Sequence, residues 1–305
     1  MEECGTLVVA ISEGEKDILR TVYNIGEENG VDRLRFLSRE ELKEREPCVE
    51  GLQALLSPTG AIVDSLGFLK EVGKDAIKNG AEYIFGEEVI SASNGLLETN
   101  KNTYYGHIIN CAGLHSDRIA HMMGVGLEYR IIPFKGSYRE VENLDINSMA
   151  YQVPDLRYPF LGVHFTKTTD GKVLAGPTAQ LALGRESYDK IDFKETLDMI
   201  TSPHFLRMCS NKDFLKLAYN NGKTNFLDSA FLEEARKLCP SIESNDLHTH
   251  PPGIRAQLVD RRGIMIDDMV VEFKKDSTHV LNAVSPGMTC SLAFAKYVVD
   301  NMNKD

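Results

Sequence analysis

The stretch that most constrains the fold lies near the C-terminus, where a strand-like run leads through a tight turn into a helix. Residues 281–289 read Leu-Asn-Ala-Val-Ser-Pro-Gly-Met-Thr, and a helical pattern follows to Met302. A strand that passes directly into a helix favours an α/β fold. The turn predicts free backbone amides at Gly287, Met288 and Thr289, where the helix dipole attracts an anion. The same spacing also fits an ordinary strand-to-helix turn.

A second turn of this kind follows residues 107–113, His-Ile-Ile-Asn-Cys-Ala-Gly. Gly113 would let a nucleotide approach the backbone closely, although this signal is weak by itself. The dinucleotide fingerprint G-x-G-x-x-G is absent, because Gly124-Val-Gly126 has Tyr129 at the third position and follows no strand. No P-loop occurs either. These 305 residues therefore contain no usual cradle for a pyrophosphate.

Long strand-like runs with turn signals at residues 129–141, 161–167 and 173–176 predict one broad, mostly antiparallel sheet, and further strands follow toward the end of the chain. Amphipathic patterns predict helices between them, and Ser38 with Glu41 has the signature of a helix capping box. No clean boundary is visible, so we expect two domains that exchange the chain back and forth. The expected strands are residues 82–85, 88–91, 129–141, 161–167, 173–176, 254–259, 270–273 and 279–283, and the expected helices are residues 13–29, 65–79, 116–123, 193–238 and 287–302.

The net charge of −11 argues against nucleic acid as a partner, because binding to phosphates requires a basic surface. No apolar run reaches the roughly 20 residues that a membrane-spanning helix needs. The first residues show neither a basic region nor an apolar one of the kind found in secretory leaders. We therefore expect a cytoplasmic protein, with peripheral contact to a membrane left open.

Six cysteines are scattered without a C-x-x-C pair, which predicts reduced and mostly buried thiols. The close pair His248-Thr-His250 lies beside two prolines without a neighbouring cysteine or acidic ligand. A loop explains this pair better than a metal site does, so we expect no metal.

Several motifs occur in the order in which one enzyme group shows them, over essentially the whole chain. The combination of Pro-Phe-Lys-Gly-x-Tyr, Leu-Gly-Val-His and Gly-Ile-Arg-Ala-Gln is specific, and it resembles the L-2-hydroxyglutarate dehydrogenase/oxidase group within the D-amino-acid-oxidase-like FAD oxidoreductases. The motifs are Cys4-Gly-Thr-Leu-Val-Val-Ala, Arg45-Glu-Pro47, Asn110-Cys-Ala-Gly-Leu-His-Ser-Asp117, Pro133-Phe-Lys-Gly-Ser-Tyr138, Phe160-Leu-Gly-Val-His164, Gly253-Ile-Arg-Ala-Gln257 and Asn282-Ala-Val-Ser-Pro286.

The resemblance implies an α/β fold with an incomplete Rossmann-like FAD domain and a substrate domain that holds a large mixed, mostly antiparallel sheet. We expect the FAD domain in residues 66–125 and 251–305, and the substrate domain in residues 1–65 and 126–250. The implied reaction is oxidation of L-2-hydroxyglutarate, or a close 2-hydroxy acid, to the 2-oxo acid with reduction of FAD. Electrons would then pass to oxygen or to a membrane quinone.

Members of the group begin with a strand, a G-x-G-x-x-G turn and a helix, and Cys4 corresponds to a point well beyond that unit. This difference predicts a shortened or misplaced start, a separate N-terminal FAD-binding polypeptide, or loss of the cofactor. A sister activity on amino acids or glycerol 3-phosphate is one alternative function, because the fold alone does not fix the substrate. A non-catalytic subunit or flavin-free remnant is the other.

Four residues follow from the resemblance as candidates for substrate chemistry. His164 is the candidate base for the hydroxyl proton, since a histidine pKa lies close to working pH. Arg255 is the candidate grip for a carboxylate, because its planar fork makes two parallel hydrogen bonds. Lys135 and Tyr138 are further candidate substrate contacts, although strand alternation argues against both facing one pocket. A core histidine, a structural ion pair for Arg255 and a solvated edge lysine are the structural alternatives.

The resemblance also places the nucleotide. The backbone at Val89 would lie against the adenine, and Ala112 with Gly113 would line the same cleft. Asp267 and Asp268 resemble an acidic stretch near the flavin, although a solvated turn explains them almost as well. The C-terminal turn would hold a reduced flavin, which is an anion, through its backbone at Ser285, Pro286, Gly287, Met288 and Thr289.

Overall fold

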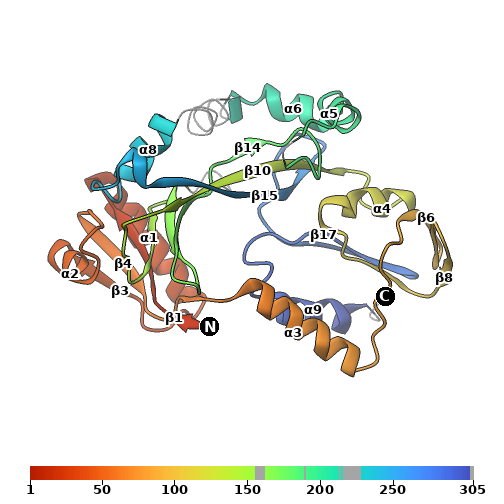
Figure 1. Cartoon of the computed structure of the whole chain (residues 1–305). Coiled ribbons are helices and arrows are strands. Elements are labelled where there is room, and N and C mark those ends of the chain that lie inside the picture. Colours follow the sequence, from red (N-terminus) through yellow and green to blue (C-terminus); the bar gives the residue numbers. More distant parts are fainter. Residues whose placement is uncertain (155–161, 189, 213, 216–227, 303–305) are drawn as a thin grey trace. The chain divides into compact units, whose positions relative to one another are not determined.

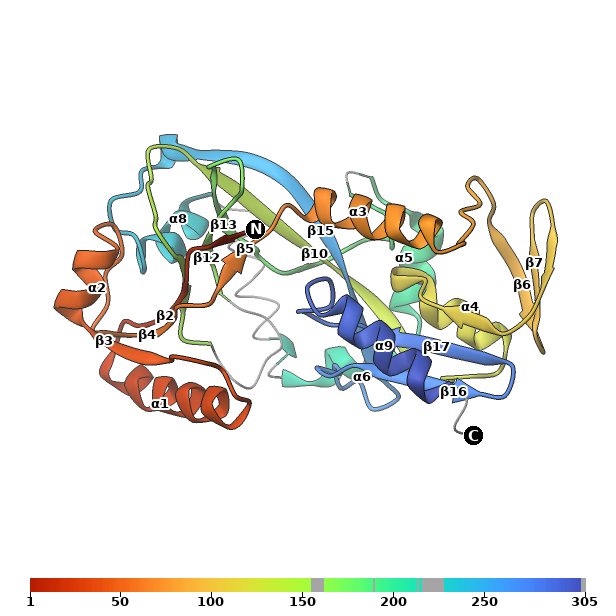
Figure 2. The same ribbon diagram turned by 90° about the horizontal axis from the view of Figure 1, so that it is seen from below.

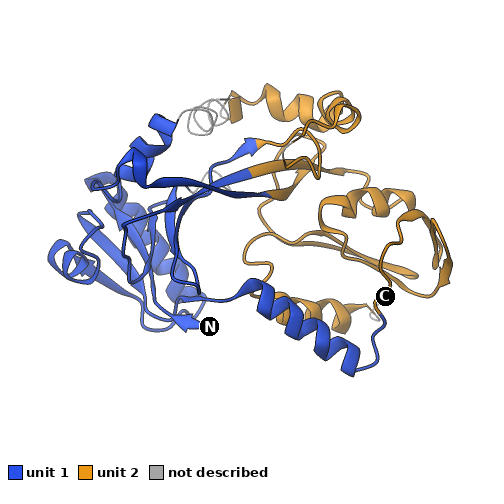
Figure 3. Cartoon of the chain, viewed as in Figure 1, with its two compact units in different colours: residues 1–82, 136–180, 218–253 blue, residues 83–135, 181–217, 254–305 orange. Residues whose placement is uncertain are grey.

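The computed structural model describes residues 1–305 except 155–161, 189, 213, 216–227 and 303–305 (Figure 1). The chain divides into two compact units that exchange it repeatedly, as expected (Figure 3). Unit 1 holds residues 1–82, 136–180 and 218–253, and unit 2 holds residues 83–135, 181–217 and 254–305. The cofactor and substrate domains predicted from the motifs have other boundaries, and they remain a prediction.

A large mixed sheet dominates the fold, and the predicted broad, mostly antiparallel sheet is confirmed. Its strand order is β14-β10-β13-β12-β11-β2-β4-β3, with β15 paired to β10. The pair β11 and β2 is parallel, whereas the pairs β10–β13, β12–β13, β11–β12, β2–β4 and β3–β4 are antiparallel. The strands are β2 (Thr6–Ala10), β3 (Arg35–Ser38), β4 (Gln53–Ser57), β10 (Tyr129–Val141), β11 (Met149–Gln152), β12 (His164–Lys167), β13 (Val173–Gly176), β14 (Gln180–Leu181) and β15 (Leu247–Asp260).

Helices of unit 1 pack on this sheet through their apolar faces. Helix α1 (Glu13–Glu28) lies along β2 and β4 (Figure 2), and Leu19 packs with Ala10 and Leu55 in the core. Helix α2 (Arg39–Arg45) begins at the predicted capping box, in which the Ser38 hydroxyl accepts from the Glu41 amide at 3.2 Å. The remaining elements of unit 1 are α3 (Ser65–Lys78), α8 (Asp228–Arg236), η2 (Ser244–Asp246) and the strand pair β1 (Glu2–Glu3) with β5 (Ala61–Ile62).

Unit 2 is built around a three-stranded sheet in the order β16-β17-β9. Strands β17 and β9 are parallel, and helix α4 packs against both. The elements are β9 (Ile108–Asn110), η1 (Gly113–His115), α4 (Ser116–Met122), α5 (Phe193–Ile200), α6 (Pro203–Ser210), β16 (Val270–Lys274), β17 (Ser277–Asn282), α9 (Ser291–Asn301) and the antiparallel sheet of β6 (Val89–Ser93), β7 (Leu96–Thr99) and β8 (Thr103–Tyr105).

Three local expectations need correction. Residues 82–85 form no strand, and Phe85 is 83% exposed, because the apolar run finds no partner strand within the described chain. The helical stretch expected from 193 to 238 breaks at Ser202, which caps α6, and residues 213 and 216–227 lie outside the described part. Helix α9 begins at Ser291 rather than Gly287, because residues 285–290 remain in turns. None of the described helices is both long and apolar enough to cross a membrane.

Candidate functional site

His164 begins β12, and its surroundings fix the state of its ring. Its Nδ1 lies 3.0 Å from the carbonyl oxygen of Gly162. A carbonyl only accepts, so Nδ1 carries the hydrogen and donates it. In the neutral ring Nε2 then holds the free lone pair, which is the atom that accepts a proton. Burial lowers the pKa of His164 to about 4, against a smaller opposing effect of the Gly162 hydrogen bond. The imidazole is therefore neutral near neutral pH.

Tyr151 is the immediate neighbour of this imidazole. Ala150 pairs with Phe165 across β11 and β12, and continuing that antiparallel register by one step puts Tyr151 opposite His164. Directly opposed residues of neighbouring strands share one face of the sheet. The two rings stack with their centroids 4.3 Å apart and an angle of 23° between their planes. The sequence motifs do not predict this contact, since they carry no information on strand register.

Tyr138 lies close to Gly176, the residue that pairs with His164. Gly176 pairs with His164 across β13 and β12, and a Cβ at Gly176 would lie 3.0 Å from the Tyr138 ring and 2.8 Å from the Ser137 carbonyl oxygen. Its φ of +137° also favours glycine. The Tyr138 ring meets His250 edge to face at 6.3 Å. Burial, with a smaller contribution from Tyr151, raises the pKa of Tyr138. The structure thus brings together the predicted base and one predicted substrate contact.

Lys135 and Arg255 both belong to unit 2. Lys135 lies three residues before Tyr138 on β10, so regular alternation puts their side chains on opposite faces. The Lys135 ammonium donates to the carbonyl oxygen of Tyr188. Arg255 is half-buried on β15, and burial lowers the pKa of its guanidinium. A desolvated cation of this kind gains more from a carboxylate than a solvated one does.

The predicted nucleotide turns lie at one edge of the unit 2 sheet. Strands β9 and β17 are parallel, with His279 opposite Asn110, so both carboxyl ends point to the same edge. The Asn110 side chain accepts from the Ala112 amide at 3.2 Å and shapes the turn. Gly113 has a φ of +54°, and a Cβ there would meet no atom within 4 Å. In open α/β sheets this edge is where ligands bind.

The turn after β17 reaches the same edge and leads into α9. In the described chain the amides of Gly287, Met288 and Thr289 donate to no acceptor, whereas the Cys290 amide bonds the Pro286 carbonyl at 3.1 Å. Gly287 is required, because a Cβ would lie 2.8 Å from the Ala283 carbonyl oxygen. Unpaired amides ahead of an 11-residue helix, beside the Gly113 turn, fit an anionic part of a nucleotide cofactor.

The other predicted contacts are less distinctive. Val89 begins β6 and is half-buried opposite Thr99. Asp267 and Asp268 are exposed, and the Asp268 carboxylate accepts from the Met269 amide at 2.7 Å. No group of three side chains suited to a metal ion occurs among the described residues. The six cysteines form no disulfide.

A buried ion pair next to the Gly113 turn escaped the sequence analysis. Asp117 and Arg185 have side chains only 2% and 5% exposed, and two hydrogen bonds of 2.5 and 2.9 Å join them. Arg185 also donates to the carbonyl oxygen of Leu114, and the Ile131 amide donates to Asp117 at 2.9 Å. Burial raises the pKa of Asp117, but the hydrogen bonds and charge of Arg185 outweigh it and leave that pKa below its usual value.

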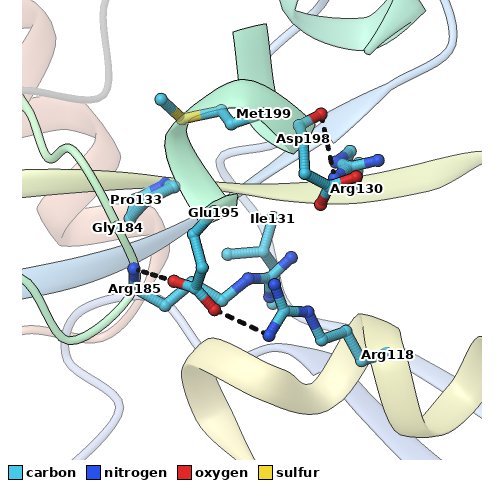
Figure 4. Close-up of a pocket in the computed structure, with 9 residues that line it drawn as sticks. All are labelled: Arg118, Arg130, Ile131, Pro133, Gly184, Arg185, Glu195, Asp198 and Met199. Carbon is cyan, nitrogen blue, oxygen red and sulfur yellow. Dashed lines mark hydrogen bonds and ion pairs between the residues drawn. The ribbon is translucent and has the colours of Figure 1, made fainter. Parts of the chain in front are cut away.

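Glu195 extends this pair into a network at a small pocket (Figure 4). Its carboxylate accepts from the Arg185 amide at 2.6 Å and from the Arg118 guanidinium at 2.8 Å. Burial raises the pKa of Glu195, and these two donors lower it further than burial raises it. Arg130 and Asp198 form a separate ion pair at the pocket wall. Each charge has a partner of opposite sign, so the network stabilises the fold around the turn.

Comparison with known proteins agrees with this arrangement. A family described as FAD dependent oxidoreductase matches residues 1–301. The chain is 33% identical over 312 residues to the L-2-hydroxyglutarate dehydrogenase of Escherichia coli K12, covering 99% of this chain and 73% of the relative. It is also 33% identical over 336 residues to the human mitochondrial L-2-hydroxyglutarate dehydrogenase, covering 99% of this chain and 71% of the relative.

Solved structures support the fold alone, because their sequences are more distant. The L-alpha-glycerophosphate oxidase of Mycoplasma pneumoniae with FAD bound gives a TM-score of 0.70 at 22% identity, covering 100% of this chain and 74% of that one. The glycine oxidase of Bacillus cereus gives a TM-score of 0.66 at 14% identity, covering 100% of this chain and 75% of that one.

Proposed function

The chain belongs to the family of FAD-dependent oxidoreductases that includes the L-2-hydroxyglutarate dehydrogenases, and we propose that it oxidises L-2-hydroxyglutarate, or a close 2-hydroxy acid, to the 2-oxo acid. FAD supplies the acceptor for the hydride that leaves the hydroxyl-bearing carbon. The observation that carries the proposal is the state of His164, a neutral ring whose free lone pair is on Nε2, on the sheet face that Tyr151 shares.

In this proposal each candidate residue has a distinct role. The Nε2 atom of His164 takes the hydroxyl proton as the carbon is oxidised. The Tyr138 hydroxyl contacts the substrate, and Arg255 binds one of its carboxylates. Lys135 lies on the opposite face of β10 from Tyr138 and donates to the Tyr188 carbonyl, so its predicted substrate contact is not part of the proposal. The turns at Ala112, Gly113 and 285–289, with the backbone at Val89, hold the cofactor.

Replacing Arg255 with lysine tests the carboxylate grip. The variant keeps the charge but loses the two-pronged contact, and a charge-assisted hydrogen bond is worth roughly 1.5–3 kcal/mol. In a flavin-loaded protein that also carries the dinucleotide-binding unit, we therefore expect KM for the 2-hydroxy acid to rise about tenfold or more, with a smaller change in kcat. Steady-state kinetics with Lys274→Arg, a change at an exposed position, provide the matched control. An unchanged KM would assign Arg255 to a structural contact.

We further propose that the pyrophosphate cradle comes from residues outside these 305, in the same polypeptide or in a separate one. Strand β9 pairs with β17 on one edge, and no other described strand pairs with its second edge. Ile109 on that strand is 46% exposed. A further parallel strand added here would bring a G-x-G-x-x-G turn to the edge where the other two turns already lie.

One experiment tests both proposals. The 305-residue chain alone is expected to bind FAD weakly or not at all, whereas a fused protein, carrying a strand-turn-helix unit with G-x-G-x-x-G ahead of Met1, should purify yellow. Adding L-2-hydroxyglutarate to the fused protein without oxygen should bleach its flavin absorbance. Stoichiometric flavin on the 305 residues alone would contradict the need for the added unit.

The substrate panel of the same experiment separates the alternatives. Glycerol 3-phosphate and amino acids are expected to leave the flavin oxidised, because neither carries a 2-hydroxy acid. Bleaching by one of them, and not by L-2-hydroxyglutarate, would replace the proposed substrate. A fused protein that binds FAD yet reacts with no member of the panel would favour a non-catalytic role.

A further inference from the structure

We propose that Tyr151 is a positioning residue for His164, whose ring holds the imidazole in one orientation and keeps water from one of its faces. The catalytic meaning of this contact depends on the proposed function, while the contact itself does not. Both residues belong to unit 1. The proposal stands on the stacked geometry, on the strand register and on the hydrogen bond that fixes the other side of the ring.

Stacking and the Gly162 hydrogen bond restrict the imidazole in different ways. The bond from Nδ1 to the Gly162 carbonyl selects the tautomer and fixes one ring atom. The ring can still turn about its Cβ–Cγ bond within the tolerance of that hydrogen bond, and a nearly parallel aromatic ring with its centroid 4.3 Å away restricts this rotation. Together they leave Nε2 in one place, which is the requirement for a proton acceptor that must meet a substrate hydroxyl.

Tyr151 is itself held in position. A side-chain hydrogen bond with Thr166 of β12 lowers the pKa of its phenol, although burial has the larger effect and raises that pKa overall. Thr166 lies two residues beyond His164, so it shares that face of the strand. The tyrosine is thus tied by its hydroxyl to the strand whose first residue it covers.

The electrostatic surroundings of His164 point to burial as the cause of its neutrality. The titratable groups facing this region are Tyr151 on β11, Tyr138 on β10 and His250 on β15, with Cys4 beside Tyr151. Desolvation accounts for the low pKa of His164, and the Gly162 bond opposes it. Removing the ring that covers the imidazole should admit water and raise this pKa.

NMR titration of the 305-residue chain labelled at histidine Cε1 tests the inference without flavin. Between about pH 5.5 and 8, the range in which an ordinary histidine titrates, the His164 signal should stay fixed in the wild type. It should also stay fixed in Tyr151→Phe, which keeps the ring. In Tyr151→Leu it should titrate within the window. His164→Gln assigns the signal.

Each other outcome overturns the inference. A His164 signal that does not titrate in Tyr151→Leu shows that the tyrosine ring is not what shields the imidazole from water. A His164 signal that titrates in Tyr151→Phe assigns the shielding to the tyrosine hydroxyl. If Tyr151→Leu fails to fold, Tyr151→Met, whose flexible unbranched side chain adapts to the space without a flat surface, replaces it with the same expectation. A wild-type His164 that titrates normally also ends the proposal.

The pH dependence of flavin reduction in the fused protein separates this inference from the proposed function. If His164 is the base, reduction in Tyr151→Leu should need a higher pH than in the wild type, because the protonated imidazole accepts no proton. Tyr151→Phe should restore the wild-type profile. An NMR shift without a matching kinetic shift would keep the positioning contact and remove His164 from the role of base.

Discussion

Arg185→Ala is expected to lower the free energy of unfolding by about 3–5 kcal/mol, the loss seen when one partner of a buried ion pair is removed. The variant leaves the Asp117 carboxylate 2% exposed and without its two hydrogen bonds from Arg185. It also removes the donor to the Leu114 carbonyl. Urea unfolding followed by circular dichroism measures the change. Arg20→Ala, which breaks an exposed pair with Asp17, should cost less than about 1 kcal/mol.

The pH dependence of this loss has a definite sign. In the wild type Arg185 holds the pKa of Asp117 below its usual value, so the pair stabilises the fold at neutral pH and is lost only in strong acid. In Arg185→Ala burial should outweigh the remaining hydrogen bond from the Ile131 amide and raise the pKa of Asp117. The difference between variant and wild type should therefore shrink as the pH falls from 7 and Asp117 takes up a proton. A pH-independent difference would contradict this account.

A double variant that removes both charges tests why Arg185→Ala is destabilised. Replacing Arg185 with methionine and Asp117 with leucine removes both charges and keeps apolar volume, so it should recover part of the lost stability. If the double variant is no more stable than Arg185→Ala, the uncompensated carboxylate is not what destabilises the single variant.

The Asp117 side of the buried ion pair could be predicted from the sequence, but its partner could not. The motif from Asn110 to Asp117 predicted a strand, a glycine turn and a helix, and the structure places all three. Its partner Arg185 stands 68 residues later in a stretch without a motif. A buried charge needs a partner, but periodicity does not say which distant residue supplies it. A buried aspartate inside an apolar strand-turn-helix motif was the available signal.

The same limit applies to the substrate side of the site. His164 and Tyr138 each lay in a motif, and the strands that carry them were predicted. Tyr151 lay in a segment for which no strand was predicted, and only the register of β11 against β12 puts it over the imidazole. Register depends on pairing between distant segments, so one sequence seldom fixes it. The strand predicted at residues 82–85 was wrong, because apolar residues alone do not form a strand without a partner strand.

The largest kinetic effect is expected for His164→Ala in the fused protein. General-base catalysis typically contributes about 10²–10⁴-fold, so the rate of flavin reduction by L-2-hydroxyglutarate should fall within that range. Substrate affinity should change little, because the imidazole acts on the hydroxyl proton as the carbon is oxidised. Stability should also change little, since among the described residues the half-buried ring makes a single hydrogen bond, to the Gly162 carbonyl, beside its stacking on Tyr151.

Stopped-flow reduction across pH decides whether His164 holds this role. The wild-type imidazole has a pKa of about 4, so it should remain a competent base down to weakly acidic pH, and reduction should decline only below that point. The variant should be slow at every pH and should partly recover at high pH, where hydroxide replaces the missing base. His248→Ala is the matched control, because that exposed histidine of unit 1 lies 3.3 Å from Glu142 and has no role in the proposed chemistry. A His164→Ala protein that reduces its flavin at a near-normal rate and loses only affinity would make His164 a binding residue.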